Sequence, residues 1–332
     1  MPHRIMDWSD IKDDFIGSTI ILGNGASIAV NNNFNYSSLR DHVITNDMID
    51  DNINKIFIFF DTSDFELILR LVWQANNINK ALNINDKITS QVYINIRDSL
   101  IRAVRNIHPT YESVEDQLPN IYNFLKQFNT IISLNYDLIL YWTMMYGKSI
   151  KDYHAFKDCF ISSIFDDNWQ QFREPINSQR YCSLVFYPHG NLLLARNKIE
   201  TETKISSLDN YNLLDTILQK WESCDYIPLF VSEGTKDQKN KSIQSSYYLN
   251  TVYREVLSSI NGNLVIYGWG IGEQDMHIID RVKKSRLRKI AVSVYGNNQA
   301  YCNRVEQIFN DNSNDDLEVI FFDSQSNNCW NR

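Results

Sequence analysis

The sequence predicts an α/β fold of the Rossmann type: a doubly wound, mainly parallel sheet with a helical insertion. Short apolar runs recur along the chain, and most are apolar at every position rather than at alternate ones. Such runs are typical of strands that are buried on both faces, as in a parallel sheet. Several intervals between the runs carry apolar residues at helical spacing, and this alternation favours a doubly wound arrangement.

Seven segments are expected to form strands. In chain order they are Thr19–Leu22, Thr130–Leu134, Leu184–Tyr187, Ile227–Val231, Leu264–Tyr267, Ile290–Val294 and Leu317–Phe322. One of the helical segments, residues 247–260, has a clear apolar face. That face consists of Leu249, Val252, Tyr253, Val256 and Ile260.

Residues 61–128 interrupt the alternation because they contain no convincing strand. We expect three helices in this interval, over Phe65–Ile78, Ile88–Ile107 and Ile121–Phe128. We interpret the interval as a helical insertion that packs over one end of the sheet, within a single domain spanning residues 1–332. A second irregular stretch, about residues 195–222, is expected to be a loop followed by a helix.

Charge and hydropathy narrow the classes of function. The 332 residues carry a formal net charge of −8, which argues against direct nucleic-acid binding over a broad surface. The basic segment RVKKSRLRK, residues 281–289, is interpreted as the solvated end of a helix, with a contact to a partner or a nucleic acid as the alternative. No apolar run approaches the length of a membrane span, and the polar N-terminus lacks the pattern of a signal peptide. We therefore expect a cytoplasmic protein that does not enter a membrane.

The cysteines give no sign of a metal centre. The five cysteines are scattered, and no two of them form a C-x-x-C pair. Zinc ribbons are built from such pairs, so we expect no bound zinc or other metal.

The stretch TIILGNGASIAV, residues 19–30, predicts a phosphate cradle between a strand and a helix. Gly23 and Gly25 permit positive φ and let a backbone approach a ligand closely. The amides that follow point beyond the helix N-terminus, where the helix dipole favours an anion. The residues of this cradle are Gly23, Asn24, Gly25, Ala26 and Ser27. A third glycine of the dinucleotide fingerprint is replaced by Ile28, and a tight turn without ligand is the alternative.

Three further strand ends carry polar or glycine-rich sequence. They are Asn135-Tyr136-Asp137, His189-Gly190 and Gly268-Trp269-Gly270. Ligands of open α/β sheets bind at the carboxyl ends of the strands, so we expect these residues to converge with the cradle. Taken singly, each has a structural interpretation: Asp137 as a helix cap, His189 as a turn histidine, and the glycines as the end of a strand.

The ordered motifs resemble those of the sirtuin-like (silent information regulator two) domains. ILGNGASIAV looks like their first nucleotide loop, SLNYD like their Asn-bearing strand end, and PHGN like their catalytic histidine motif. DFELIL, residues 64–69, and PLFVSEGTKDQKNKSI, residues 228–243, resemble further parts of bacterial members, and the resemblance covers roughly residues 15–325. The zinc module of the protein-deacylating members is absent, Leu134 stands where they have Gln, and Gly268-Trp269-Gly270 replaces their Gly-Thr-Ser. The chain is therefore more similar to the bacterial branch that hydrolyses NAD+ in antiphage defence.

The resemblance implies an NAD+ glycohydrolase that needs no metal. Asn135 is expected to hold a ribose hydroxyl or the attacking water, and His189 to act as the base. The cradle, together with Asp137, Gly268, Trp269 and Gly270, is expected to bind the nucleotide. Asn297, after the strand Ile290–Val294, could reach the adenosine ribose, although a turn-forming role is the alternative.

Two further expectations concern partners and the main alternative function. Members of the defence branch assemble into oligomers and some join a HerA-like ATPase, so self-association is expected. Phe57, Phe59, Phe60 and Trp73 of the insertion region, with Trp330 near the C-terminus, are candidate interface residues. The alternative is that these side chains complete the domain's own core. The alternative function is a module that binds NAD+ or an ADP-ribose derivative without turnover.

Overall fold

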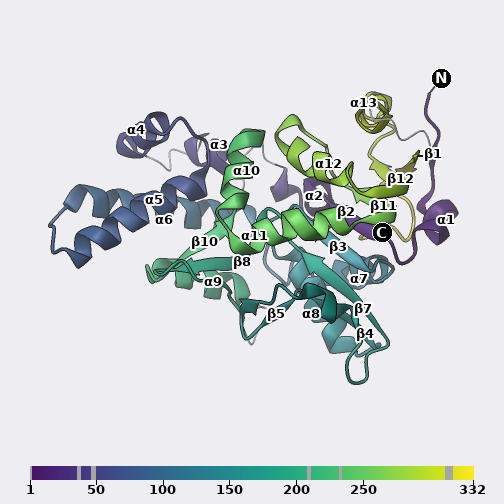
Figure 1. Ribbon diagram of the computed structural model, residues 1–332, viewed down its shortest axis with the longest axis horizontal. Helices are drawn as coiled ribbons and strands as arrows, with labels where there is room; N and C mark the ends of the chain where they lie inside the picture. The colour runs from purple at the N-terminus through teal and green to yellow at the C-terminus, as the bar shows by residue number, and fades with distance from the viewer. Residues whose placement is uncertain (1, 36–38, 46–49, 208–210, 232–233, 311–316) are drawn as a thin grey trace.

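The structure, a computed structural model, describes residues 2–35, 39–45, 50–207, 211–231, 234–310 and 317–332. Its centre is a sheet of eight strands that all pair in parallel, flanked by helices (Figure 1). Across the sheet the strands are β1 (Ile5–Met6), β13 (Glu318–Asp323), β12 (Arg286–Val294), β11 (Asn261–Tyr267), β2 (Thr19–Leu22), β3 (Thr130–Ser133), β7 (Tyr181–Phe186) and β4 (His154–Lys157). The predicted Rossmann-like, doubly wound α/β fold is confirmed.

The α-helices of the described residues fall between these strands and in the interval before β3. They are α1 (Trp8–Ile11), α2 (Asn24–Val30), α3 (Leu39–Thr45), α4 (Asp51–Phe59), α5 (Phe65–Ala81), α6 (Lys87–Ile107), α7 (Leu118–Leu125), α8 (Ile139–Ile150), α9 (Leu213–Glu222), α10 (Lys236–Gln244), α11 (Tyr247–Thr251), α12 (Met276–Val282) and α13 (Gln299–Asn310). The three helices predicted between residues 61 and 128 are present as α5, α6 and α7.

The strand order reverses beside β2. The strands that follow β2 in the chain, namely β3, β4 and β7, lie on one side of it, whereas β11, β12 and β13 lie on the other. The boundary between β2 and β11 is therefore the topological switch point, where ligands bind in open α/β sheets. Both loops that leave the carboxyl ends of these two strands are the glycine-rich segments singled out in the sequence.

A second, antiparallel sheet lies beside the main one. It contains β10 (Tyr226–Phe230), β8 (Gly190–Asn197) and β9 (Glu202–Lys204), and a separate hairpin pairs β5 (Phe160–Ile161) with β6 (Ile164–Phe165). The run Ile227–Val231 was expected in the parallel sheet, and that expectation is wrong. The run is buried in either sheet, so its apolar character cannot distinguish the two. The stretch 195–222 likewise contains the end of β8 and all of β9 before α9, where only a loop was expected.

The helical interval packs mainly on this second sheet and its neighbours. Helices α5 and α6 pack against each other, α5 contacts β10, and α6 contacts α9. Helices α5 and α6 together extend from one end of the molecule (Figure 1). Helix α7 instead packs against α8, next to the main sheet.

The apolar side chains form one large core that includes several residues expected at the surface. Trp330, with nothing evident in the sequence to pack on, is only 2% exposed. Its Nε1 donates to the carbonyl of Ala26 at 2.8 Å, and its ring lies against Tyr267 and Phe124. Trp330 is therefore not an exposed interface residue, because the C-terminal segment folds back over α2.

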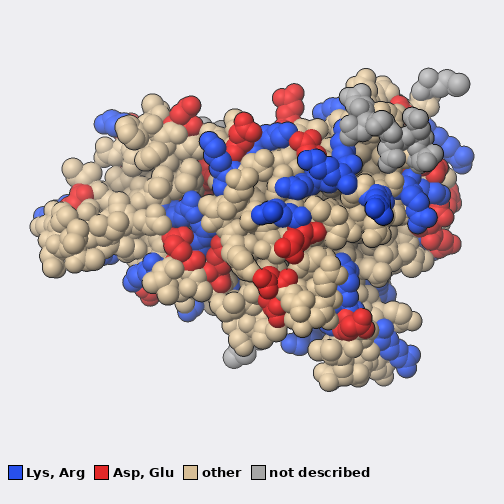
Figure 2. All heavy atoms as spheres, viewed as in Figure 1, with Lys and Arg blue, Asp and Glu red and all other residues tan. Residues whose placement is uncertain are grey.

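The surface carries both signs of charge, and basic groups gather over the area where α12 lies in Figure 1 (Figure 2). In the basic segment 281–289, Lys284, Arg286 and Arg288 are exposed, while Lys289 pairs with Asp14 at 2.7 Å. The expectation of a solvated helix end holds for the first part of the segment, where α12 ends at Val282, and is wrong for Arg286–Lys289, which begin β12. Among the described residues, no helix combines the length and the apolar character that crossing a membrane requires.

Candidate functional site

The loops after four neighbouring strands meet at one edge of the main sheet. The register aligns Leu22 at the end of β2 with Ser133 of β3 and with Tyr267 of β11. It also aligns Ile132 of β3 with Phe186 of β7. The segments that follow these strands therefore lie at the same edge, as predicted, on both sides of the switch point.

The two glycine loops at this edge are packed directly against each other. The amide of Gly23 donates to the Tyr267 carbonyl at 2.9 Å, and the amide of Gly25 donates to the Gly268 carbonyl at 2.6 Å. A Cβ added to Gly23 would lie 2.5 Å from Trp269 Cα, and one added to Gly25 would lie 2.7 Å from the Gly268 oxygen. Glycine is therefore needed here so that two loops of the protein can touch.

This packing changes what the predicted cradle can offer an anion. Gly23 has φ −108° and Gly25 lies inside α2, so neither uses the left-handed conformation, which belongs to Gly268 at φ +65°. The Ala26 amide also donates within the protein, to the Gly23 carbonyl at 2.9 Å. With these amides engaged, the loop has fewer free donors for a pyrophosphate than its sequence suggests. The side chain of Asn24, at the exposed start of the helix, donates to the Phe34 carbonyl at 3.1 Å.

Asn135 and Ser27 form a polar centre between β2 and β3. Asn135 Nδ2 donates to Ser27 Oγ at 2.8 Å and to the Gly23 carbonyl at 3.0 Å. Ser27 Oγ in turn donates to Asp137 Oδ2 at 2.5 Å. Among the described residues, Asn135 Oδ1 has no hydrogen-bond partner, and the residue is only half-buried. This oxygen is therefore available to accept a hydrogen bond from a hydroxyl group or a water.

Asp137 also has the structural role proposed as its alternative. Its Oδ1 accepts from the Ile139 amide at 2.9 Å at the start of α8, and its carbonyl accepts from Asn191 Nδ2 at 2.7 Å. The carboxylate thus fixes the loop that presents Asn135.

His189 lies next to this centre but faces into the protein. Its Nε2 is 3.0 Å from Nε2 of His277, and the residue is 3% exposed. A hydrogen bond with the Leu134 backbone acts to raise the pKa of His189. This direction is the one expected when a ring N–H donates to a carbonyl. Nε2 faces His277, so the ring is enclosed by protein groups at the position from which it could take a proton.

Burial keeps both imidazoles neutral. Burial is the main cause of a lowered pKa at His189, and together with the charge of the nearby Lys239 it brings this pKa well below 6.5. Burial also lowers the pKa of His277 to about 4. Burial raises the pKa of the neighbouring Asp275, but the charge of Lys239 and hydrogen bonds from Lys239 and Trp269 act in the opposite direction, and the net pKa lies below its ordinary value.

The carboxylate of Asp275 is held by two donors. Lys239 Nζ lies 2.8 Å from Oδ1, and Trp269 Nε1 lies 3.3 Å from Oδ2. Trp269 is buried, whereas Gly270 beside it is exposed and its carbonyl accepts from Arg304 at 2.6 Å. The second glycine loop therefore connects the polar centre to a buried His–His–Asp–Lys cluster.

Asn297 has the conformation of a turn residue. It follows β12 with φ +56°, is exposed, and accepts a hydrogen bond from Gln299 Nε2 at 2.9 Å. The structure therefore supports the turn-forming alternative for this residue.

Two members of the buried cluster, His277 and Lys239, were not among the residues expected from the sequence. His277 follows the second glycine loop in GIGEQDMH, where Asp-x-His was the available signal. Lys239 comes from α10, and nothing in its sequence distinguishes it from solvated lysines. It lies 36 positions from Asp275, so only the fold brings the two together.

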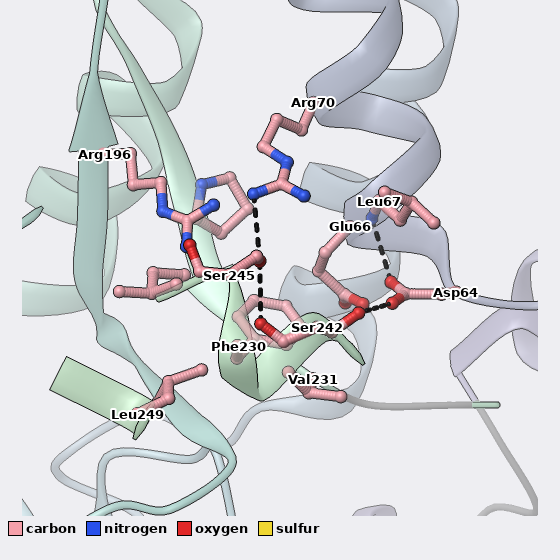
Figure 3. A pocket seen from close by; sticks show the side chains of 12 residues that line it. Asp64, Glu66, Leu67, Arg70, Arg196, Phe230, Val231, Ser242, Ser245 and Leu249 are labelled. Carbon is pink, nitrogen blue, oxygen red and sulfur yellow. Dashed lines mark hydrogen bonds between the residues drawn. The ribbon is translucent and has the colours of Figure 1, made fainter. Parts of the chain in front are cut away.

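A separate pocket lies between α5, α10 and the second sheet (Figure 3). Arg70 and Arg196 both approach Ser245: Arg70 donates to its hydroxyl at 3.3 Å and Arg196 to its carbonyl at 2.9 Å. Asp64, the first residue of DFELIL, caps α5 and accepts from Ser242 at 2.6 Å. These contacts attach the insertion to α10. Ser232 and Glu233 of the PLFVSEGTKDQKNKSI segment lie outside the described residues.

Comparison with known proteins places the chain in a family without assigning it an activity. No curated protein matches the chain. The model of one family, Domain of unknown function (DUF4917), matches residues 20–330, from β2 to beyond β13. The chain therefore belongs to the DUF4917 family.

Proposed function

We propose that this protein is an NAD+ glycohydrolase, which cleaves NAD+ to nicotinamide and ADP-ribose. The observation that carries the proposal is the Asn135–Ser27–Asp137 centre beside two glycine loops, at the switch point of a parallel sheet. Nucleotides bind at such points in open α/β folds. The ordered motifs that resemble the sirtuin-like domains support NAD+ as the nucleotide.

The reaction requires positioning more than acid catalysis. The bond between ribose C1′ and the nicotinamide nitrogen breaks, its electron pair leaves with neutral nicotinamide, and a water oxygen bonds to C1′. The water loses one proton, which a base must accept. The free Oδ1 of Asn135 can accept a hydrogen bond from the water or a ribose hydroxyl and so orient it.

His189 is the proposed proton acceptor, and its neutral state suits that role. Its ring is enclosed by protein groups, so it can take a proton from substrate only after one contact is released. The 3.0 Å contact between its Nε2 and Nε2 of His277 is the one to release.

His189 is buried and in contact with His277, so it is not placed to take a proton from substrate while this contact holds. This favours a second candidate function, a module that binds NAD+ or an ADP-ribose derivative without turnover. Incubation of purified protein with NAD+, followed by measurement of free nicotinamide and of bound nucleotide, separates the two. Release supports the glycohydrolase. NAD+ binding without nicotinamide release, both alone and with the proposed HerA-like partner present, supports the sensing module.

The resemblance extends the proposal to a biological setting. We propose that the protein acts in the cytoplasm, depletes NAD+ during antiphage defence that ends in abortive infection, and works as a homo-oligomer. A HerA-like ATPase is the proposed heteromeric partner, and nicotinamide release should therefore be assayed with and without it.

A further inference from the structure

We infer that His189, His277 and Asp275 form a binding site for a divalent first-row transition ion of the Zn²⁺ class. One ligand atom from each residue lies within 4.8 Å of the other two. The residues follow β7 and β11, two strands on opposite sides of β2 and β3, so the fold assembles the set at the carboxyl edge. The inference goes beyond the proposed function and does not use it.

The orientation of the two imidazoles carries the argument. His277 Nδ1 lies 3.2 Å from the Gln274 carbonyl, which fits a proton on that nitrogen. If both Nδ1 atoms carry the proton, both Nε2 atoms present lone pairs to each other across 3.0 Å. Two opposed lone pairs repel, and a cation between them removes the repulsion. Metal-binding histidines are oriented in this way, with the second nitrogen donating to a carbonyl.

The spacing also suits an ion. Two nitrogens that lie about 2.0–2.1 Å from one ion, at an angle between about 90° and 109°, are separated by about 2.8–3.4 Å. The observed 3.0 Å between His189 and His277 falls in this range. Imidazole nitrogens with one carboxylate form a donor set that suits divalent first-row metals.

Lys239 both supports and opposes the site. It holds Asp275 through Oδ1, leaving Oδ2 with only the 3.3 Å contact from Trp269, so Oδ2 is the oxygen that can turn to an ion. The ammonium is buried, however, and its charge repels a second cation. Removing this charge should therefore strengthen ion binding, whereas removing a ligand should weaken it.

Nε2 of His189 can either bind an ion or act as a free base, but it cannot do both at once. If an ion were held by Nε2, His189 would serve as a ligand and not as the base, and the ion would supply activation of a water as nucleophile. Metal uptake is measured without NAD+, so its outcome stays separate from that of the proposed function.

Metal titration of the full chain tests the site. Protein stripped with EDTA should bind one Co²⁺ per chain, seen by visible absorption and elemental analysis. His277→Gln and Asp275→Asn, with folding verified by circular dichroism, should each weaken binding by at least about tenfold, and His154→Gln, far from the cluster, should not. Lys239→Met should tighten binding by at least about tenfold.

Three results would overturn the inference. The first is wild-type protein that takes up no ion at millimolar Co²⁺. The second is uptake that survives His277→Gln and Asp275→Asn. The third is an affinity that Lys239→Met leaves unchanged, because the bound ion would then lie away from the cluster.

Discussion

The amide of Gly25 donates a 2.6 Å hydrogen bond to the carbonyl of Gly268, across the switch point between β2 and β11. The two residues are 243 positions apart in the sequence, yet a Cβ on Gly268 would lie 2.3 Å from the Ala26 nitrogen. The loops that face the proposed ligand are therefore one packed unit. A substitution in either loop should therefore shift the backbone of the other.

Gly25→Ala should destabilise the fold, because the new methyl would lie 2.7 Å from the Gly268 oxygen and the backbone would have to move. We expect the free energy of unfolding to fall by about 1–3 kcal/mol, measured by urea denaturation. Gly270→Ala is the matched control, since nothing lies within 4 Å of its added Cβ. Equal stability of the two variants would contradict the close packing.

Asn135→Ala should slow nicotinamide release by about 10- to 100-fold, because a positioning hydrogen bond to a reacting group contributes about 1.5–3 kcal/mol. Asn261, exposed at the start of β11 and hence at the opposite edge of the sheet, offers the control Asn261→Ala. If Asn135→Ala keeps wild-type turnover, Asn135 does not position the reacting groups.

The sequence predicted the sheet better than it predicted the site. Continuous apolar runs such as Ile290–Val294 identify strands buried on both faces, and parallel strands necessarily bring their carboxyl ends to one edge. The convergence of Asn135, His189 and the glycine loops could therefore be expected. The direction in which each side chain points depends on packing. The orientation of His189 toward His277 could therefore not be predicted from the sequence.

Long-range packing explains the other differences. Trp330 is buried because a segment at the end of the chain reaches Ala26 near its beginning, and no local pattern encodes such a contact. The absence of C-x-x-C pairs excludes a zinc ribbon but gives no information about a His–Asp–His set whose members are 88 positions apart. Ligand spacing is informative only when the ligands share one local motif.

Stability should decrease as the pH falls below about 6.5, the ordinary pKa of histidine in the unfolded chain. Burial is the main cause that lowers the pKa of His108 and of His154 in the fold. The unfolded chain then binds protons that the folded chain refuses, so the stability present above 6.5 is lost as the pH drops toward the folded pKa values. Each group contributes up to about 1.4 kcal/mol per pH unit.

Urea denaturation between pH 7 and pH 5 measures this slope. A double variant, His108→Gln with His154→Gln, should show a shallower decrease than the wild type. An unchanged slope would mean that neither histidine resists protonation in the folded protein.

Self-association can be tested on the outer part of the α5–α6 pair. Ile78, Leu82 and Ile88 are 58%, 64% and 72% exposed, and Phe59 of α4 is 80% exposed, whereas Phe57 and Trp73 are buried in the core. Exposed apolar side chains of this kind mark interfaces. Light scattering should report a mass above the 39.0 kDa of one chain, and Leu82→Glu with Ile88→Glu should lower it. A monomer at all concentrations would contradict self-association.

His189 decides between the mechanisms at the centre of the site. His189→Ala should reduce nicotinamide release by at least about 100-fold, because the residue is either the base or a ligand of the ion that carries the attacking water. Calorimetry should still detect NAD+ binding, since the proposed nucleotide contacts lie mainly on the glycine loops and Asn135. His277→Gln separates the two roles. An ion-bound His189 requires His277, so both variants should lose turnover together. Full turnover of His277→Gln beside an inactive His189→Ala would instead assign the proton to a free imidazole at His189, and would leave the glycohydrolase proposal standing without the ion.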